Sequence, residues 1–479
     1  MLATFTSVEH ELKSLVRGEC FFDAGTRELY STAASWYKIQ PVGVVFPRDV
    51  EDVQVVIRFC YDNEIPMIPR GAGTGLAGQA VGMGIVLDFT KQMNAVLKVE
   101  ENSIDVQPGL VLQTLNEQLA ARGKFFPIDP ASGSLCTLGG MIATNAAGAH
   151  GLKYGATKDH VESLDIVLSD GELATIQVNP PDAHPVTTFS GVYNELRNLL
   201  LPKRDLFRQQ FPKVAKNSSG YNLVEATQDG NLDLRKLLVG SEGTLAVVVS
   251  ATLNTTQRPG HQIGALAYFA DYESTVDATV KALEFQPAAI EILDRTFFSL
   301  GLADPSARLV RPEARTMLYF EFEGDRLDEL MQASEGLKES IKQFHPLEFV
   351  FLKTEQDRSA FWNLREDVSK KLNLTETFGK SSFIEDVTVP LTALPEYFGG
   401  LSKILSGHGI KFSAYGHAGA GNIHCATFVD LANQQHYRAV DLIAAEVSDL
   451  AISLGGTLSG EHGDGFVRTP FLERLYGAE

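Results

Sequence analysis

Four residues in two glycine-rich segments near the C-terminus have the types and spacing of a metal-assisted catalytic centre. His417 and His424 flank a glycine-containing turn, so their side chains can converge, which they could not do seven residues apart on one straight strand. Glu461 adds a carboxylate, and this His₂Glu set suits a Zn²⁺-like ion with an open coordination position. His462 would then be a free imidazole beside the metal, suited to general-base work. A lone histidine is usually structural, but three of the chain's eleven histidines lie in these two segments.

Arg365 is a candidate clamp for a substrate carboxylate. It lies in the segment 361–366, which we expect to be helical. A planar guanidinium can bind the carboxylate of a 2-hydroxy acid through two parallel hydrogen bonds. The alternative, a solvated arginine on an exposed helix face, has near-equal weight from the sequence alone.

A glycine-rich loop in the N-terminal half predicts a phosphate-binding site. Four glycines fall within residues 71–78, after the apolar run 65–68. Without Cβ atoms, successive N–H groups can converge on an anion such as a diphosphate. Residues 73–78 also satisfy the dinucleotide fingerprint, but a Rossmann loop must open a helix. Here two more glycines and a β-rich apolar run follow, so we predict helix, strand, glycine loop and strand; the alternative is a merely tight turn.

Two further clusters of small residues, at 137–148 and 240–244, suggest that one extended ligand touches all three glycine-rich regions. The first cluster is too rich in glycine for a stable isolated helix and too polar for a core strand. It can lie flat against a planar cofactor and offer the Thr144 and Asn145 side chains. Tight backbone packing between elements is the alternative.

The elements that must position these residues predict an α+β protein of two or three domains. In the first half, Asp49 can cap a helix whose buried face carries Val53 and Val56, and Asp170-Gly171 marks a hairpin within 160–178. We also expect two short strands within 95–108 and a helix over 110–122. After a linker at 258–261, the strand-like runs alternate with amphipathic helices, and partial apolar alternation predicts an antiparallel sheet covered on one face. The expected strands are 264–269, 317–322, 347–352 and 383–389, and the expected helices are 327–344, 355–372 and 435–454.

Composition excludes several classes of protein. The 479 residues carry 41 basic and 60 acidic side chains, and the formal net charge of −19 argues against nucleic-acid binding and gives no support to a polybasic membrane anchor. Four scattered cysteines without a CxxC pair argue against disulfides and against an iron–sulfur cluster within this chain. No signal peptide or membrane-length apolar run is evident. We therefore expect a cytoplasmic protein, at most peripheral at the inner face of a membrane.

Taken together, six motifs in order carry a resemblance to a known family. They are PRGAGTGLAGQ, GGMIATNAAGAHGLKYG, KNSSGYNL, GSEGTLA, GHAGAGNIH and GEHGDG. The chain resembles flavoprotein oxidoreductases of the vanillyl-alcohol oxidase/p-cresol methylhydroxylase (PCMH) type. Within them it is most similar to the D-2-hydroxyacid dehydrogenases, which include D-lactate dehydrogenase, the glycolate oxidase catalytic subunit and D-2-hydroxyglutarate dehydrogenase. The resemblance runs from about Pro41 to Gly465.

The resemblance implies an N-terminal extension at 1–36, a two-subdomain FAD-binding domain of PCMH type at 37–258 and an α+β cap domain with an antiparallel sheet at 259–479. Non-covalent FAD would have its diphosphate in the loop at 70–79. His417, His424 and Glu461 match the family's divalent-metal ligands, with Zn²⁺ expected, and His462 matches its catalytic base. Arg365 lies in the segment that supplies a substrate-binding arginine, and Lys380 is a second candidate cation. The implied FAD-binding residues are Pro69, Arg70, Gly71, Ala72, Gly73, Thr74, Gly75, Leu76, Gly78, Gln79, Thr137, Gly140, Thr144, Asn145, Gly148, Glu242, Gly243, Leu245 and Val247.

The implied activity is oxidation of a D-2-hydroxy acid to the 2-oxo acid by hydride transfer to FAD. The electron acceptor would be a quinone, a cytochrome, an electron-transfer flavoprotein or a fused iron–sulfur region. Three alternatives remain: a NAD-dependent Rossmann dehydrogenase, a His₂Glu metallohydrolase, and a non-catalytic or incomplete flavin-binding subunit. Family chains continue past the Glu-His motif, so we expect a fragment of a longer polypeptide, with apolar surface exposed near Phe471.

Overall fold

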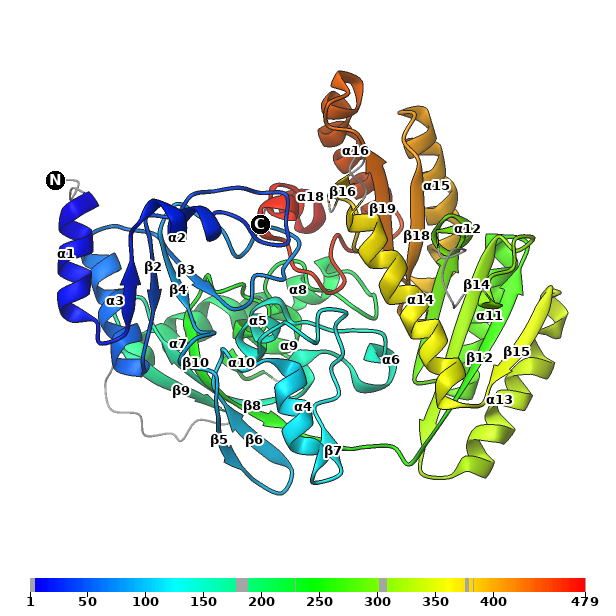
Figure 1. Ribbon diagram of the computed structural model, residues 1–479, viewed down its shortest axis with the longest axis horizontal. Helices are drawn as coiled ribbons and strands as arrows, with labels where there is room; N and C mark the ends of the chain where they lie inside the picture. Colours follow the sequence, from blue (N-terminus) through cyan, green and yellow to red (C-terminus); the bar gives the residue numbers. More distant parts are fainter. Residues whose placement is uncertain are drawn as a thin grey trace.

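The computed structural model describes residues 5–177, 188–228, 230–300, 308–374, 379–381 and 383–478. Figure 1 shows two halves side by side, with the N-terminal half in blue to green and the C-terminal half in green to red. The predicted linker at 258–261 lies between them, because β11 (Thr256–Gln257) pairs with β7 (Lys124–Phe125) of the first half and β12 (His261–Phe269) belongs to the second.

A small sheet at the N-terminal end carries the glycine loop. Its strand order is β1-β2-β4-β3, in which β2, β4 and β3 are parallel and β1 is antiparallel. The strands are β1 (Glu19–Phe21), β2 (Gly43–Phe46), β3 (Met67–Arg70) and β4 (Ile85–Asp88). Helix α3 (Val50–Asp62) is capped by Asp49 and buries Val53, Val56, Ile57 and Cys60, as predicted. The order helix, strand, glycine loop and strand is therefore confirmed, and no helix follows the loop before β4.

A second, antiparallel sheet completes the first half, in the order β5-β6-β10-β8-β9. Its strands are β5 (Val96–Val99), β6 (Ser103–Val106), β8 (Val161–Val167), β9 (Leu173–Gln177) and β10 (Val247–Asn254). The predicted hairpin is confirmed as β8 and β9. Helix α4 (Leu112–Ala120) is shorter than expected and buries Leu112, Leu115 and Leu119.

One expectation for this half is wrong, because residues 138–144 do form a helix. Helix α5 (Leu138–Thr144) begins where the Thr137 side chain accepts a hydrogen bond from Gly140 N, and it ends at Asn145 in the left-handed conformation. Leu138, Met141 and Ile142 are buried in the core of this half. Packing and capping therefore stabilise a seven-residue helix that glycine content alone disfavours.

The second half is built on one antiparallel sheet in the order β15-β12-β14-β13-β18-β19-β16, with β17 paired to β19. Besides β12, its strands are β13 (Ala289–Asp294), β14 (Thr316–Gly324), β15 (Glu348–Leu352), β16 (Gly379–Ser381), β17 (Val387–Thr388), β18 (Phe412–His417) and β19 (Asn422–Val429). The main helices are α11 (Tyr272–Ala282), α12 (Arg295–Ser299), α13 (Leu327–Ile341), α14 (Glu355–Leu374), α15 (Leu394–Gly407) and α16 (Gln434–Ser453). The predicted helices and three of the predicted strands are present, with shifted ends. The prediction of a strand over 383–389 is mostly wrong: only Val387–Thr388 is a strand, and residues 383–386 form bends and turns in which Asp386 O accepts from Gly460 N.

Both faces of this sheet are covered, so the expectation of one covered face is wrong. Leu318 and Phe320 of β14 pack into a core with α11, α13, α15 and α16. Met317 and Tyr319 point to the other face and pack against α12 and α14. The alternation in β14 was partial because apolar residues are required on both faces.

The last described elements, α17 (Gly465–Arg468) and α18 (Leu472–Tyr476), pack against the rest of the molecule. Leu475 is buried, Phe471 is partly buried against the core of the second half, and Tyr476 stacks near Phe211 and donates to Ser219 O at 2.6 Å. The expected exposed apolar surface at Phe471 is therefore wrong, because the segment finds partners in both halves. Within the described part of the chain, no helix is long and apolar enough to cross a membrane.

Candidate active site

A cavity of about 510 Å³ lies between the two halves and collects most of the predicted site residues. From the first half, its lining comes from the glycine loop, α5, the segment 146–149 and the start of β10. From the second half, it comes from α14, the facing ends of β18 and β19, and the segment that carries Glu461 and His462. This volume suits a large organic ligand. The cavity wall is apolar over most of its area and polar at one end.

The glycine loop presents unused backbone donors to the cavity. Within the residues that the structure describes, the N–H groups of residues 71–76 donate no hydrogen bond to the protein. A Cβ on Gly71 would lie 2.1 Å from Thr137 Oγ1, and Gly73 has a φ of +70°. Arg70 holds the loop from behind, donating to Thr32 O and Ala80 O, both at 2.9 Å. Free amides in a glycine-rich loop on the wall of a cavity suit a phosphate group.

Three side chains from distant segments meet at the polar end of the cavity. Glu461 Oε1 lies 3.1 Å from His417 Nε2 and 3.4 Å from His424 Nε2. The two histidines stand at the facing ends of β18 and β19, where antiparallel pairing places His417 opposite Asn422 and Tyr415 opposite His424. The convergence predicted for this His₂Glu set is therefore present in the fold.

The other ring nitrogen of each histidine is fixed by a hydrogen-bond partner. His417 Nδ1 lies 2.5 Å from Glu291 Oε1, and His424 Nδ1 lies 3.2 Å from Glu385 O. This arrangement leaves both Nε2 atoms directed at Glu461, as in metal sites whose ligating histidines are oriented by an outer partner. Burial lowers the pKa of His424, which favours the neutral ring that a metal ligand requires. Burial alone would raise the pKa of Glu461, but Lys216 and His417 outweigh it and hold the pKa well below its usual range.

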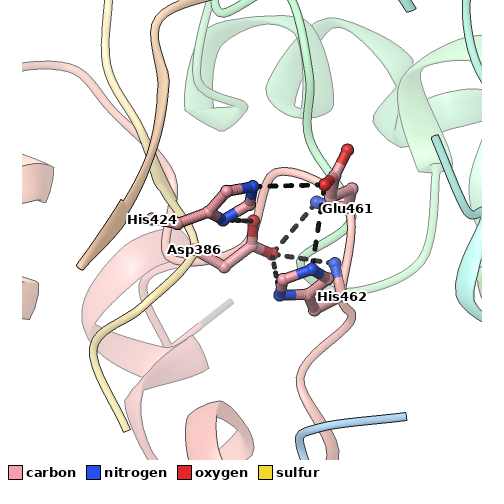
Figure 2. Close-up of side chains that lie close together, drawn as sticks. All are labelled: Asp386, His424, Glu461 and His462. Carbon is pink, nitrogen blue, oxygen red and sulfur yellow. Dashed lines mark hydrogen bonds and ion pairs between the residues drawn. The ribbon is translucent and has the colours of Figure 1, made fainter. Parts of the chain in front are cut away.

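Figure 2 shows a second set around the same carboxylate, in which Asp386, His424, Glu461 and His462 converge. Their ligand atoms lie within 4.8 Å of one another. Asp386 is less suited than His417 as a ligand, because its oxygens already accept hydrogen bonds from the Ser459 hydroxyl, the Asn422 amide and two backbone N–H groups. Asp386 instead fixes the backbone on which Glu461 and His462 stand.

His462 is held by a buried carboxylate and faces the cavity. Its Nδ1 lies 2.9 Å from Glu385 Oε1, which also accepts from Arg468 Nη2 at 2.8 Å. Its ring stacks on that of His424, with centroids 5.2 Å apart. Burial alone would lower the pKa of His462, but Asp386 and Glu385 outweigh it and raise the pKa to about 10. The Nε2 atom is 3.7 Å from Glu461 Oε1 and is the ring nitrogen not held by Glu385.

Arg365 lies in the wall of the same cavity and is buried, with 8% of its surface exposed. It is therefore not the solvated arginine of the alternative interpretation. Its Nε lies 2.7 Å from Glu291 Oε2, and its guanidinium lies 6.0 Å from the ring centroids of Trp362 and Tyr415. Glu291 thus contacts both Arg365 and His417. The side chain of Lys380, the other candidate cation, lies outside the described residues.

Two family profiles match the chain, one in each half. The profile described as "FAD binding domain" matches residues 41–177, and that described as "FAD linked oxidases, C-terminal domain" matches residues 258–479. The chain thus carries an FAD-binding domain followed by the C-terminal domain of FAD-linked oxidases.

Curated relatives have sequences similar to this chain over nearly its whole length. The glycolate oxidase subunit GlcD of Bacillus subtilis is 28% identical, over 97% of this chain and 90% of its own length. The D-2-hydroxyglutarate dehydrogenase of Escherichia coli is 29% identical, over 94% of this chain and 47% of its own length. The probable mitochondrial D-lactate dehydrogenase of Danio rerio is 29% identical, over 95% of this chain and 83% of its own length. The chain thus spans most of two of these relatives and about half of the third.

Solved structures with little sequence similarity share the fold. p-Cresol methylhydroxylase superposes with a TM-score of 0.70 at 14% identity, over 98% of this chain and 90% of its own. An alkyldihydroxyacetonephosphate synthase superposes with a TM-score of 0.67 at 17% identity, over 95% of this chain and 81% of its own. The expected PCMH-type FAD-binding fold followed by an oxidase C-terminal domain is confirmed.

Most of the residues predicted to bind FAD line the cavity between the two halves. Three do not: Gly78 packs toward Tyr37 and Phe466, Asn145 ends α5 and lines a separate cavity, and Leu245 is 37% exposed. The predicted residues in the lining are Pro69, Arg70, Gly71, Ala72, Gly73, Thr74, Gly75, Leu76, Gln79, Thr137, Gly140, Thr144, Gly148, Glu242, Gly243 and Val247.

Glu242 is one of these lining residues and also joins the two halves. It accepts hydrogen bonds from Asp464 N at 2.5 Å and Gly465 N at 2.9 Å. Burial, together with Asp464, raises the pKa of Glu242 to about 7. The side chain predicted for the flavin site thus also orients the loop beyond His462.

We call the His₂Glu set together with His462 the ionic centre. Sequence reasoning missed the residues that hold it in place. Glu291 lies in the middle of the largely apolar strand β13, which ends in a second acid, and Glu385 and Asp386 are adjacent acids before β17. Charged residues in otherwise buried runs are almost always paired, and this pattern was the available signal. Lys216 lies in the KNSSGYNL motif and contacts Glu461 Oε2 at 2.7 Å, a partner 245 residues away that no local pattern indicates.

Proposed function

We propose that this chain is an FAD-dependent dehydrogenase that oxidises a D-2-hydroxy acid to the 2-oxo acid. The observation that carries the proposal is one cavity in which a glycine-lined wall with free amides meets Arg365, His462 and the His₂Glu set. FAD, when bound, supplies the acceptor for the hydride that leaves the substrate carbon. The names of the curated relatives, which include two dehydrogenases of 2-hydroxy acids, support the choice of substrate class.

Arg365 is the side chain that we propose to bind the substrate carboxylate. Its ion pair with Glu291 uses Nε, so both Nη groups stay available for a bidentate contact. Trp362 and Tyr415 flank the guanidinium and restrict its movement. The carboxylate would then be fixed close to the ionic centre, which orients the hydroxyl-bearing carbon.

We propose that His417, His424 and Glu461 hold a divalent metal, with Zn²⁺ the best fit to two imidazoles and a carboxylate. The oriented Nδ1 atoms and the ionised Glu461 support this fit. When bound, such an ion lowers the pKa of a substrate hydroxyl.

His462 is the general base in this proposal and would accept the hydroxyl proton at Nε2. Glu385 fixes Nδ1 and stabilises the imidazolium that forms. A cation at the neighbouring His₂Glu set would oppose the high pKa of His462 and favour the neutral ring that a base requires. The two side chains that would handle the proton, His462 and Glu385, both belong to the second half.

Non-covalent FAD is part of the proposal. His150, which follows the small-residue cluster 137–148 in the chain, has both ring nitrogens engaged, with Asp129 at 2.6 Å and Glu321 at 2.9 Å. The electron acceptor is proposed only by class: a quinone, a cytochrome, an electron-transfer flavoprotein or an iron–sulfur region. We also propose a cytoplasmic protein, at most peripheral at the inner face of a membrane, which the four free cysteines support.

Anaerobic bleaching of the flavin tests the proposal. The FAD-loaded protein is mixed with D-lactate, glycolate or D-2-hydroxyglutarate, and L-lactate serves as the control of opposite configuration. We expect rapid loss of flavin absorbance with at least one member of the panel and little with L-lactate. A flavin that stays oxidised with every D-2-hydroxy acid would contradict the proposed substrate class.

A further inference from the structure

Lys216 connects the flavin-binding half to the proposed metal site. It stands between α8 (Arg204–Gln210) and α9 (Leu223–Ala226), and it is buried, with 7% of its surface exposed. Its ammonium donates to Gly148 O at 2.8 Å and to Glu461 Oε2 at 2.7 Å. Gly148 belongs to the cavity wall of the first half, and Glu461 belongs to the second.

The contact divides the two oxygens of Glu461 between different partners. Oε2 accepts from Lys216, whereas Oε1 faces His417 Nε2 and His424 Nε2. A carboxylate held in this way offers one oxygen to a metal ion. One-oxygen coordination suits a four-coordinate ion with N and O ligands, whereas larger, harder cations often take both oxygens of a carboxylate.

The residues after Lys216 keep this arrangement in place. Ser218 N donates to Ser459 O at 2.8 Å, and Ser459 N donates to Ser219 Oγ at 3.0 Å. Gly220 N donates to the Asp464 carboxylate at 2.6 Å. The segment 216–220 therefore clamps the loop that carries Glu461. Holding this loop is a structural role for the KNSSGYNL motif.

We propose that Lys216 is a positioning residue that restricts Glu461 to one metal-binding oxygen and thereby sets the metal preference of the site. The inference rests on the proposed metal at His417, His424 and Glu461. Lys216 does not line the cavity, so it acts through Glu461 and not on the substrate. If the ammonium were removed, Oε2 would become free and a positive charge beside the ion would be lost. The freed oxygen favours cations that prefer higher coordination numbers over Zn²⁺, whereas the lost charge raises the affinity for any divalent cation.

Metal preference in the FAD-loaded protein tests the inference with Lys216→Met, which has an unbranched apolar side chain of similar length. Affinities for Zn²⁺ and Mn²⁺ are measured by competition with a chromophoric chelator, and Co²⁺ is bound as a spectroscopic probe. We expect the ratio of Mn²⁺ to Zn²⁺ affinity to rise about tenfold in the variant, within the range seen when an outer-shell partner is changed. We also expect the visible Co²⁺ absorption to weaken, because six-coordinate Co²⁺ absorbs less than four-coordinate Co²⁺.

A control variant separates the ammonium from its surroundings. Lys213→Met removes an exposed lysine three residues before Lys216. It should keep the parent's metal preference and Co²⁺ spectrum. An unchanged affinity ratio and spectrum in Lys216→Met would overturn the inference.

The Co²⁺ spectrum of the parent protein tests the same point if Lys216→Met does not retain FAD. A strong, four-coordinate spectrum is expected, and a weak, six-coordinate spectrum would contradict one-oxygen binding by Glu461. A parent protein that binds none of the three ions stoichiometrically would instead refute the proposed metal site itself.

Discussion

The two walls of the cavity are built by opposite means. The wall from the first half uses missing side chains: glycines at 71, 73 and 75 leave backbone amides unobstructed. The wall from the second half uses charged side chains, and nearly every one is held by another charged or polar group, as His417 is by Glu291 and His462 by Glu385. A backbone cradle is encoded in one short segment, whereas an ionic centre requires residues from many segments. The two walls should therefore respond to different substitutions.

The largest effect that we predict is loss of flavin in Gly73→Val. Gly73 has a φ of +70°, and a Cβ there would lie 2.7 Å from Arg70 Nη2. A β-branched residue in this conformation is strained, and it would also block the amides that face the cavity. Purified Gly73→Val should contain almost no FAD by absorbance, whereas Gly191→Val, at a helical position where a Cβ meets nothing within 4 Å, should keep it. Full flavin content in Gly73→Val would refute the proposal that the loop at 70–79 holds the FAD diphosphate.

The second prediction concerns the charged wall of the second half, where a substitution should leave the flavin in place. His462→Ala removes the proposed base, and we expect turnover to fall by about 10²–10⁴-fold, the usual range for general-base catalysis. Flavin content should stay at the parent level, because His462 belongs to the opposite wall. Steady-state kinetics with an artificial electron acceptor measures the change, and His408→Ala, a histidine paired with Glu446, is the control. Parental turnover in His462→Ala would mean that another group accepts the proton.

A smaller loss should follow Arg365→Lys, and it should appear mainly in KM. An ammonium cannot reproduce the planar fork of the guanidinium, so about 1.5–3 kcal/mol of charge-assisted hydrogen bonding is at stake. We expect KM to rise roughly tenfold to hundredfold at that free-energy difference. Arg326→Lys, on the exposed surface, is the control. If KM stays at the parent value, the carboxylate is bound elsewhere, and Lys380 is the next candidate.

The smallest predicted effect lies outside the cavity walls, at the junction of the two halves, where His150 of the first half pairs with Glu321 of the second. Burial alone would lower the pKa of His150, but Asp129 and Glu321 outweigh it and raise the pKa well above its ordinary value. A raised pKa means that the folded protein binds the proton more tightly than the unfolded chain, so this contribution to stability is full below about pH 6.5 and declines as pH rises through the folded pKa. The melting temperature of the parent should therefore fall more steeply above pH 6.5 than that of His150→Asn. Parallel curves for the two proteins would show that His150 titrates alike in both states.

The contrast between local features and contacts of distant segments also explains which parts of the structure could be predicted from the sequence. Helix α3 with its Asp49 cap, the β8–β9 hairpin and the glycine loop are local features, and each is present. Helix α5 was missed because its stability comes from buried contacts of Leu138, Met141 and Ile142 that short-range propensity does not contain. The His₂Glu set was predicted because its members lie in glycine-rich motifs. Its supports, such as Glu291 and Lys216, were missed because tertiary folding alone brings them to the site.

The most direct test of the account is the rate of flavin reduction by a D-2-hydroxy acid before and after removal of the metal. Rapid mixing under anaerobic conditions compares the parent protein as purified, after exhaustive chelation, and after Zn²⁺ is restored. Suppose that the glycine-rich wall of the first half holds FAD and the charged wall of the second half prepares the substrate. Chelation should then leave the flavin bound but slow its reduction by at least about 10²-fold, the scale of one lost catalytic group. Restored Zn²⁺ should return the rate. Full-speed reduction by the metal-free protein would contradict the division of labour between the two walls.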